Sequence, residues 1–237
     1  MNRALTRKKS PIDRFALYVA NHWLVLFSLF YGAFVLLPWL APIFMKLGLN
    51  SWGKIIYSVY SFVCHQLPER SFFLFGAQSS YSLPAIQAAW QNTNDPMVLR
   101  QFIGNAQMGW KVAWSDRMFS MYSSILLFVW IWFPLRRRIR PLPLWGFVLL
   151  AVPMLVDGGS HMISDLEGIG QGVRDTNTWL VSLTQAKFPD SFYAGDALGS
   201  FNSWVRLISG ALFSLGLVWF AFPQTFETYK AVRPPKP

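Results

Sequence analysis

Residues 23–45 form a run of 23 residues without a single charged side chain. A helix rises about 1.5 Å per residue, so this run extends about 34 Å and can cross the roughly 30 Å hydrocarbon core of a bilayer. Three more strongly apolar stretches follow at 118–135, 142–163 and 204–222. The sequence therefore predicts an all-α integral membrane protein with four transmembrane helices.

The net charge of +10 is confined to three short segments that flank these spans. They contain the N-terminal basic residues Arg3, Arg7, Lys8, Lys9 and Arg14, the run Arg136, Arg137, Arg138 and Arg140, and the C-terminal Lys230, Arg233 and Lys236. Their acidic neighbours are Asp13 and Glu227, and the other basic and acidic residues cancel. Because cytoplasmic loops carry an excess of Lys and Arg, both termini are predicted to be cytoplasmic.

Composition excludes several other classes of protein. Only 14% of the residues are charged, against roughly 25% in a typical soluble domain. The high pI alone would fit nucleic-acid binding, but no nucleic-acid motif accompanies the basic segments. A single cysteine, Cys64, excludes an internal disulfide and a cysteine-only metal site. The expected partner is the lipid bilayer, and the sequence leaves open whether other membrane subunits also bind.

One apolar segment is too short to be an ordinary span. Residues 51–64 extend only about 21 Å as a helix. If this segment crossed the membrane, the arginine run at 136–140 would lie on the side opposite the N-terminal tail. If it instead returns to the side from which it entered, all three basic segments lie on the same side of the membrane. We therefore predict a re-entrant or interfacial helix, with a fifth span as the alternative. The predicted organisation is a single membrane domain at 23–222 between two cytoplasmic tails, at 1–22 and 223–237. Within this domain the re-entrant segment is 51–66. The loops 67–116 and 164–203 form a small extracytoplasmic cap.

Ionisable residues on three different spans are predicted to reach one depth. Counting from the inner ends, Arg117 lies about 27 Å, Asp157 about 22 Å and Arg206 about 24 Å up. Charges in spans cost about 2.5–3.5 kcal/mol each, so they persist where they pair or line a polar cavity. The predicted polar pocket at the outer leaflet comprises Cys64, His65, Gln66, Glu69, Arg70, Arg117, Tyr122, Asp157, His161, Asn202 and Arg206. A purely structural cluster of ion pairs is the alternative.

The segment Cys64-His65-Gln66-Leu67-Pro68-Glu69-Arg70-Ser71 resembles the Cys-His-Gln-x-x-x-Arg-Ser signature of a family of prokaryotic multi-pass membrane proteins of unknown function. Looser blocks match around Arg117 and Tyr122, around Asp157, and around Asn202 and Arg206. The two cysteines of the family's second block are replaced by Ser115 and Met118. The resemblance implies residence in a prokaryotic cell membrane and a shared polar site, and it supplies no reaction.

The pocket residues suggest two kinds of ligand. The side chains Cys64, His65, Asp157 and His161 are competent zinc ligands, but they are weak candidates without the family's other cysteines. Anion binding is favoured, because arginines present forked donors to phosphate or carboxylate groups. A bound phospholipid is therefore plausible, and no other cofactor is predicted.

Three function classes remain open. The favoured one is an integral membrane subunit or lipid-binding scaffold. The first alternative is a membrane-embedded enzyme acting on a lipid or isoprenoid-phosphate headgroup, whose catalytic residues the sequence does not identify. The second is a small transporter, which is disfavoured because the inner halves of the spans carry no ionisable residue.

Overall fold

The computed structural model describes residues 10–232, and only the backbone for 227–232. Its main elements are four long helices, α1 (Pro11–Lys46), α5 (Asp116–Leu135), α6 (Leu144–Asp165) and α10 (Phe201–Val232). Each contains a stretch that is long and apolar enough to cross a membrane. The four predicted spans fall on these helices, so the prediction of a helical membrane protein is confirmed at this level.

Helix α1 begins well before the predicted span because Ser10 caps it. The Ser10 hydroxyl accepts a hydrogen bond from the Asp13 N–H at 3.1 Å, and the Asp13 carboxylate accepts one from the Ser10 N–H at 2.9 Å. Pro11 occupies the first helical position, where a missing N–H costs nothing. Arg14 therefore lies in the first turn of α1, whereas the predicted basic residues Arg3, Arg7, Lys8, Lys9, Arg233 and Lys236 lie outside the described residues.

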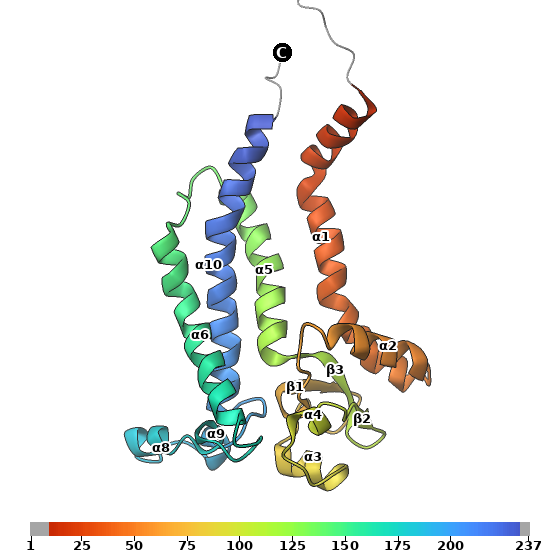
Figure 1. Ribbon diagram of the computed structural model, residues 1–237, viewed down its shortest axis with the longest axis vertical. Coiled ribbons are helices and arrows are strands. Elements are labelled where there is room, and N and C mark those ends of the chain that lie inside the picture. Colours follow the sequence, from red (N-terminus) through yellow and green to blue (C-terminus); the bar gives the residue numbers. More distant parts are fainter. Residues whose placement is uncertain (1–9, 233–237) are drawn as a thin grey trace, which may run out of the picture.

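Helix α10 packs against both α5 and α6 (Figure 1). Two glycines allow the close approach. A Cβ atom on Gly210 would lie 3.1 Å from the Arg117 carbonyl oxygen of α5, and one on Gly216 would lie 3.0 Å from the Leu150 Cβ of α6. Small residues at such contacts let membrane helices approach closely and gain van der Waals contact.

We expect Gly210→Leu to lower the free energy of unfolding by about 1–3 kcal/mol, because overpacking forces the α5 and α10 backbones apart. The measurement is unfolding in mixed micelles, followed by circular dichroism. Gly159→Leu on α6 is the matched control, since nothing lies within 4 Å of a Cβ at that position. Equal effects of the two substitutions would contradict the packing role of Gly210.

The short segment after α1 forms helix α2 (Asn50–Tyr60), which lies across the end of α1 (Figure 1). Its 11 residues extend about 16 Å, too short for a crossing. The Tyr57 hydroxyl donates to the Lys111 carbonyl at 2.5 Å, and the Tyr60 hydroxyl donates to the Phe34 carbonyl at 2.7 Å. The helix that the structure has in the predicted re-entrant segment is therefore too short to span a membrane.

A three-stranded antiparallel sheet departs from the all-α prediction. Strand β3 (Gly109–Ser115) lies between β1 (Ser71–Leu74) and β2 (Gly104–Asn105). The sequence shows no alternating pattern here because Val112, Ala113 and Trp114 in β3 are all completely buried. The strand runs directly into α5 at Asp116, so the sheet fixes the start of that helix.

The remaining short elements complete a cap at one end of the helices. They are the 3₁₀ turn η1 (Pro68–Arg70) and the helices α3 (Leu83–Ala89), α4 (Pro96–Leu99), α7 (Val173–Thr176), α8 (Thr178–Thr184) and α9 (Asp190–Tyr193). The start of α1, the α5–α6 loop and the last turns of α10 lie at the opposite end (Figure 1). The helices thus carry the folded cap at one end, whereas the described residues at the other end are helix termini and the α5–α6 loop.

Candidate functional site

Charged side chains gather where the cap meets the helices. The start of α5, the second half of α6, the first turns of α10, the turn η1 and the loops on either side of α7–α9 all contribute. The cluster contains the arginines Arg70, Arg117, Arg174 and Arg206 and the aspartates Asp116, Asp157, Asp165 and Asp196. The equal numbers of the two types make this group electrically neutral.

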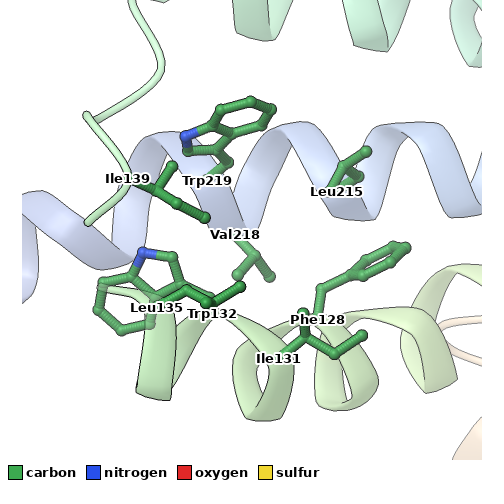
Figure 2. A pocket seen from close by; sticks show the side chains of 8 residues that line it. All are labelled: Phe128, Ile131, Trp132, Leu135, Ile139, Leu215, Val218 and Trp219. Carbon is green, nitrogen blue, oxygen red and sulfur yellow. The ribbon is translucent and has the colours of Figure 1, made fainter. Parts of the chain in front are cut away.

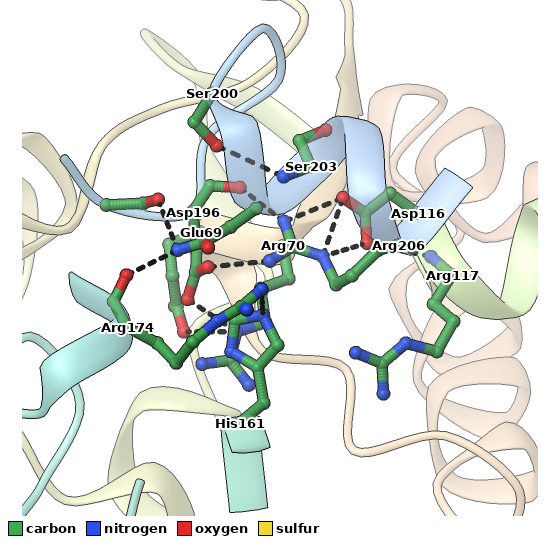
Figure 3. Close-up of polar contacts among 12 residues, drawn as sticks. Glu69, Arg70, Asp116, Arg117, His161, Arg174, Asp196, Ser200, Ser203 and Arg206 are labelled. Carbon is green, nitrogen blue, oxygen red and sulfur yellow. Dashed lines mark hydrogen bonds and ion pairs between the residues drawn. The ribbon is translucent and has the colours of Figure 1, made fainter. Parts of the chain in front are cut away.

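Arg206 holds the centre of this cluster (Figure 3). It is only 2% exposed, and its Nε and Nη2 atoms donate to the two Asp116 carboxylate oxygens at 2.8 and 2.7 Å. Its Nη1 atom donates to Asp196 at 2.6 Å. This forked geometry is the strong form of the arginine–carboxylate pair. It joins α10 to the first residue of α5 and to the loop that precedes α10.

Arg70 extends the same chain of pairs to α6. Its Nε atom donates to Asp196 at 2.7 Å, and its two Nη atoms donate to the Asp165 carboxylate at 2.7 Å each. Asp196 therefore lies between two guanidinium groups (Figure 3). Burial alone would raise the pKa of Asp196, but Arg70 and Arg206 outweigh burial and hold this pKa well below its ordinary value.

Asp157 forms a second centre on α6. It is 2% exposed, and it accepts from Arg117 Nη2 at 2.7 Å and from Arg174 Nη2 at 2.9 Å. His161, one turn further along α6, has its Nε2 atom 3.6 Å from the same carboxylate. The Ser209 hydroxyl of α10 lies 3.5 Å away. Asp157 thus links α6 to α5, to α10 and to the α7 segment.

Each of the four guanidinium groups is bound to at least one carboxylate. An added phosphate would therefore have to compete with an aspartate for these arginines, although the Nε atoms of Arg117 and Arg174 have no hydrogen-bond partner among the described residues. The crevice beside Arg70 and Asp196 is narrow, with an empty volume of about 160 Å³. The arrangement is one of internal charge compensation, which is costly to disrupt once both partners are buried.

Glu69 stands apart from these pairs. It is 2% exposed, and neither of its carboxylate oxygens has a hydrogen-bond partner among the described residues. The nearest cation is Arg70, whose Nε atom lies 4.0 Å away. Burial raises the pKa of Glu69 to about 7, although the Arg70 charge opposes this shift. Near neutral pH this carboxyl group therefore carries a proton in a substantial fraction of molecules.

Lys111 of β3 lies fully buried on the other side of the same turn. Its ammonium group donates to the Gln66 and Arg100 carbonyls at 2.7 Å each. Burial lowers the pKa of Lys111 to about 7, with Glu69 opposing the shift. Glu69 and Lys111 are thus a buried acid and a buried base of the cap whose pKa values both lie near 7.

We expect the unfolding free energy to fall by up to about 3 kcal/mol as pH rises from about 4.5 to 7, because of Glu69 alone. The folded pKa is raised, so the folded state keeps the proton over this window after the unfolded chain has released it. Glu69→Gln should remove this dependence in unfolding titrations at pH 4.5 and 7. The exposed Glu167→Gln is the matched control. An unchanged pH profile in Glu69→Gln would contradict the assignment.

The structure brings together most of the residues that the sequence singled out. Glu69, Arg70, Arg117, Asp157, His161 and Arg206 lie in or beside the cluster, and the Asn202 side chain donates to the Arg174 and Gly195 carbonyls next to it. These positions come from one turn and three helices, so their meeting depends on the packing of the cap. Whether the cluster binds a ligand stays a prediction.

Four of the predicted residues have other surroundings. The Cys64 sulfur accepts from the Gln66 and Ser115 N–H groups, and His65 is exposed. Gln66 donates to the Tyr57 carbonyl at 2.9 Å, and Tyr122 packs against Phe34 and Trp114. Within the described chain, no three His, Cys, Asp or Glu side chains gather as a metal-ion site. Cys64 and His65 thus form no joint zinc set with Asp157 and His161.

Sequence reasoning missed four members of the cluster, which are Asp116, Asp165, Arg174 and Asp196. Asp165 follows Asp157 and His161 at the same four-residue spacing, so the helical period would have indicated it. Asp116 directly precedes Arg117 at a helix start, where acids are favoured. Arg174 and Asp196 lie in irregular segments, and no sequence period identifies them.

Comparison with known proteins gives one distant relative. The chain is 28% identical over 180 residues to an uncharacterised protein of the archaeon Methanocaldococcus jannaschii, and the match covers 73% of this chain and 82% of that protein. No protein-family model matches the chain, and no solved structure is similar to it. The relative comes from a prokaryote, and its name assigns no activity.

Proposed function

We propose that the protein is an integral membrane scaffold, a subunit that presents a rigid extracytoplasmic cap to other membrane proteins. The observation that carries this proposal is the neutral cluster at the junction of cap and helices. Buried ion pairs in which each arginine has a carboxylate partner favour a fixed geometry, and the charges of these eight residues compensate one another. The cluster therefore acts as a clamp that holds the cap in one position on α5, α6 and α10.

The orientation of this scaffold is supported by the distribution of charge. Arg14, the run of Arg136–Arg140 and the end of α10 lie at the end opposite the cap (Figure 1). An excess of basic residues at one end favours its cytoplasmic placement. A green fluorescent protein fused after Arg140 should therefore fluoresce, and alkaline phosphatase at the same point should be inactive. The reverse result would invert the proposed topology.

Exposed apolar faces provide the surface for lipid or partner helices. Along α6, one stripe comprises Trp145, Leu149, Val152 and Val156, which are between 42% and 72% exposed. A second stripe on α1 includes Leu29, Leu36 and Leu40. In a membrane protein such stripes contact either acyl chains or other helices, and packing then decides which contact is made.

The test is purification from native membranes in a mild detergent, with quantitative mass spectrometry of the retained proteins. We expect at least one foreign membrane subunit at a fixed ratio. Leu149→Ala with Val156→Ala should release a subunit bound to α6, and Leu29→Ala with Leu36→Ala should release one bound to α1, so the variant that loses the subunit identifies the helix that contacts it. A protein that purifies alone from native membranes under all mild conditions would refute the scaffold role.

A membrane-embedded enzyme acting on a lipid headgroup is the second candidate, and Glu69 favours it. A buried carboxyl group beside a crevice, with its pKa raised to about 7, is typical of general acid–base residues. The enzyme function predicts that Glu69→Gln abolishes turnover of a lipid phosphate while the protein stays folded. The scaffold function predicts unchanged partner binding in the same variant.

A further inference from the structure

An apolar pocket lies between α5 and α10, close to the end that carries the arginine run (Figure 2). It encloses about 440 Å³ of empty space, part of which is open to the surroundings. Almost no polar atom faces it. Its walls come from α5, from α10 and from the loop after α5, and they include Phe128, Ile131, Trp132, Ile139, Leu215 and Trp219.

The pocket and the arginine run share one loop. Ile139 lines the pocket, and its immediate neighbours are Arg138 and Arg140. The loop folds back on the helix end, because the Ile139 N–H donates to the Leu135 carbonyl at 3.1 Å. It is also fastened to α10, where the Trp219 indole donates to the Arg140 carbonyl at 2.8 Å. The loop that closes this end of the pocket is therefore held in place, and it carries exposed arginines on both sides of a lining residue.

The arginines at this rim differ from those at the cap. Arg137, Arg138 and Arg140 are exposed, and no carboxylate pairs with their side chains among the described residues. By contrast, the four arginines of the cap cluster each bind at least one aspartate. Arg136 instead stacks on Phe133, with its guanidinium carbon 3.8 Å from the ring centre. Within the described part of the chain, three guanidinium groups without a carboxylate thus lie on the loop beside an apolar slot, a combination that suits an anion with an apolar tail.

We propose that this pocket binds one acyl chain of an anionic phospholipid, with the phosphate held by Arg137, Arg138 and Arg140. From Phe128 to Leu135 the slot follows α5 for about 10 Å, which accommodates the upper part of an acyl chain. Trp132 lies one helical turn before Arg136, and Trp219 bonds to Arg140, so both indoles lie close to the basic loop, as indoles at a membrane interface do. Basic pockets between transmembrane helices are suited to phosphate headgroups in this way. This site lies at the opposite end from the cap cluster and is independent of the scaffold function.

The experiment titrates the detergent-solubilised full chain with dioleoyl phosphatidylglycerol and, separately, dioleoyl phosphatidylcholine, and it counts bound lipids by native mass spectrometry. The wild type should retain phosphatidylglycerol preferentially. Replacing Arg137, Arg138 and Arg140 by glutamine should weaken phosphatidylglycerol binding by up to about 100-fold, because each basic residue at an anionic surface contributes about a factor of five. Phosphatidylcholine binding should change little.

The matched charge control replaces Lys46, Lys54 and Lys187, which are exposed at the cap end, by glutamine. It removes the same charge and should leave phosphatidylglycerol binding unchanged. Leu215→Trp fills the slot without changing charge and should also abolish selective retention. Equal loss in the lysine variant, or unchanged binding in Leu215→Trp, would overturn the proposal in favour of general attraction to the surface.

A test on the wild type avoids any folding defect of the variants. Phosphatidylglycerol with a diazirine in one acyl chain is photolysed in the complex, and the labelled peptides are sequenced. Labelling should concentrate on residues 128–139 and 215–219. Labels spread evenly over the exposed faces of α1 and α6 would refute a defined acyl-chain site. A protein bound at the arginine run in place of the lipid would also refute the acyl-chain site.

Discussion

Replacing Arg206 by methionine is expected to lower the free energy of unfolding by about 3–5 kcal/mol, the largest loss that we predict for any single residue. Arg206 is 2% exposed and compensates two carboxylates, Asp116 and Asp196. Removing it leaves Asp116 buried without a cation and leaves Asp196 with Arg70 alone. The measurement is reversible unfolding in mixed micelles, together with the yield of monodisperse protein.

A double variant separates charge compensation from packing. Asp116→Leu combined with Arg206→Met removes both partners of the pair, so it should recover more than half of the loss. The control is Arg100→Met, because among the described residues the Arg100 side chain donates to the Ser61 carbonyl alone, at 3.2 Å. That single hydrogen bond should be worth about 1–2 kcal/mol. Additive losses in the double variant would show that Arg206 acts by packing and not through its charge.

The spans could be predicted from the sequence because one property determines them. A long run of apolar residues has few stable alternatives to a transmembrane helix, since every backbone polar group must be paired within the bilayer. The same helical rise predicts a common depth for Arg117, Asp157 and Arg206, and that depth stays a prediction. Their lateral convergence did not follow, because it depends on the rotation of α5, α6 and α10 about their axes.

The cap was predicted less well, for a different physical reason. Its strand β3 is buried on both faces, so the alternation that identifies a strand at a surface is missing. Asp196 and Arg174 reach the cluster through loops whose course depends on contacts such as the Asn177 side chain with the Arg174 and Tyr193 carbonyls. Such contacts form only after the helices have packed, and no local sequence pattern encodes them.

The Asp157→Asn variant distinguishes the two candidate functions most directly. Asparagine has the shape of aspartate but no charge, so Arg117 and Arg174 would lose their shared anion. Because Asp157 is 2% exposed, we expect a loss of about 3 kcal/mol in the free energy of unfolding. The scaffold proposal therefore predicts a loosened cap, with faster proteolysis of residues 166–200 and weaker retention of partner subunits.

Asp165→Asn on the same helix is the matched control for this variant. Its side chain is 21% exposed, and its partner Arg70 keeps a second carboxylate in Asp196. The expected loss is therefore about 1 kcal/mol or less. An enzyme that uses Asp157 in catalysis would show the same loss of stability, because Arg117 and Arg174 lose their anion in either case, and Asp157→Asn would in addition be inactive toward a lipid phosphate under conditions where it stays folded. Stability equal to the wild type in Asp157→Asn would rule out the clamp.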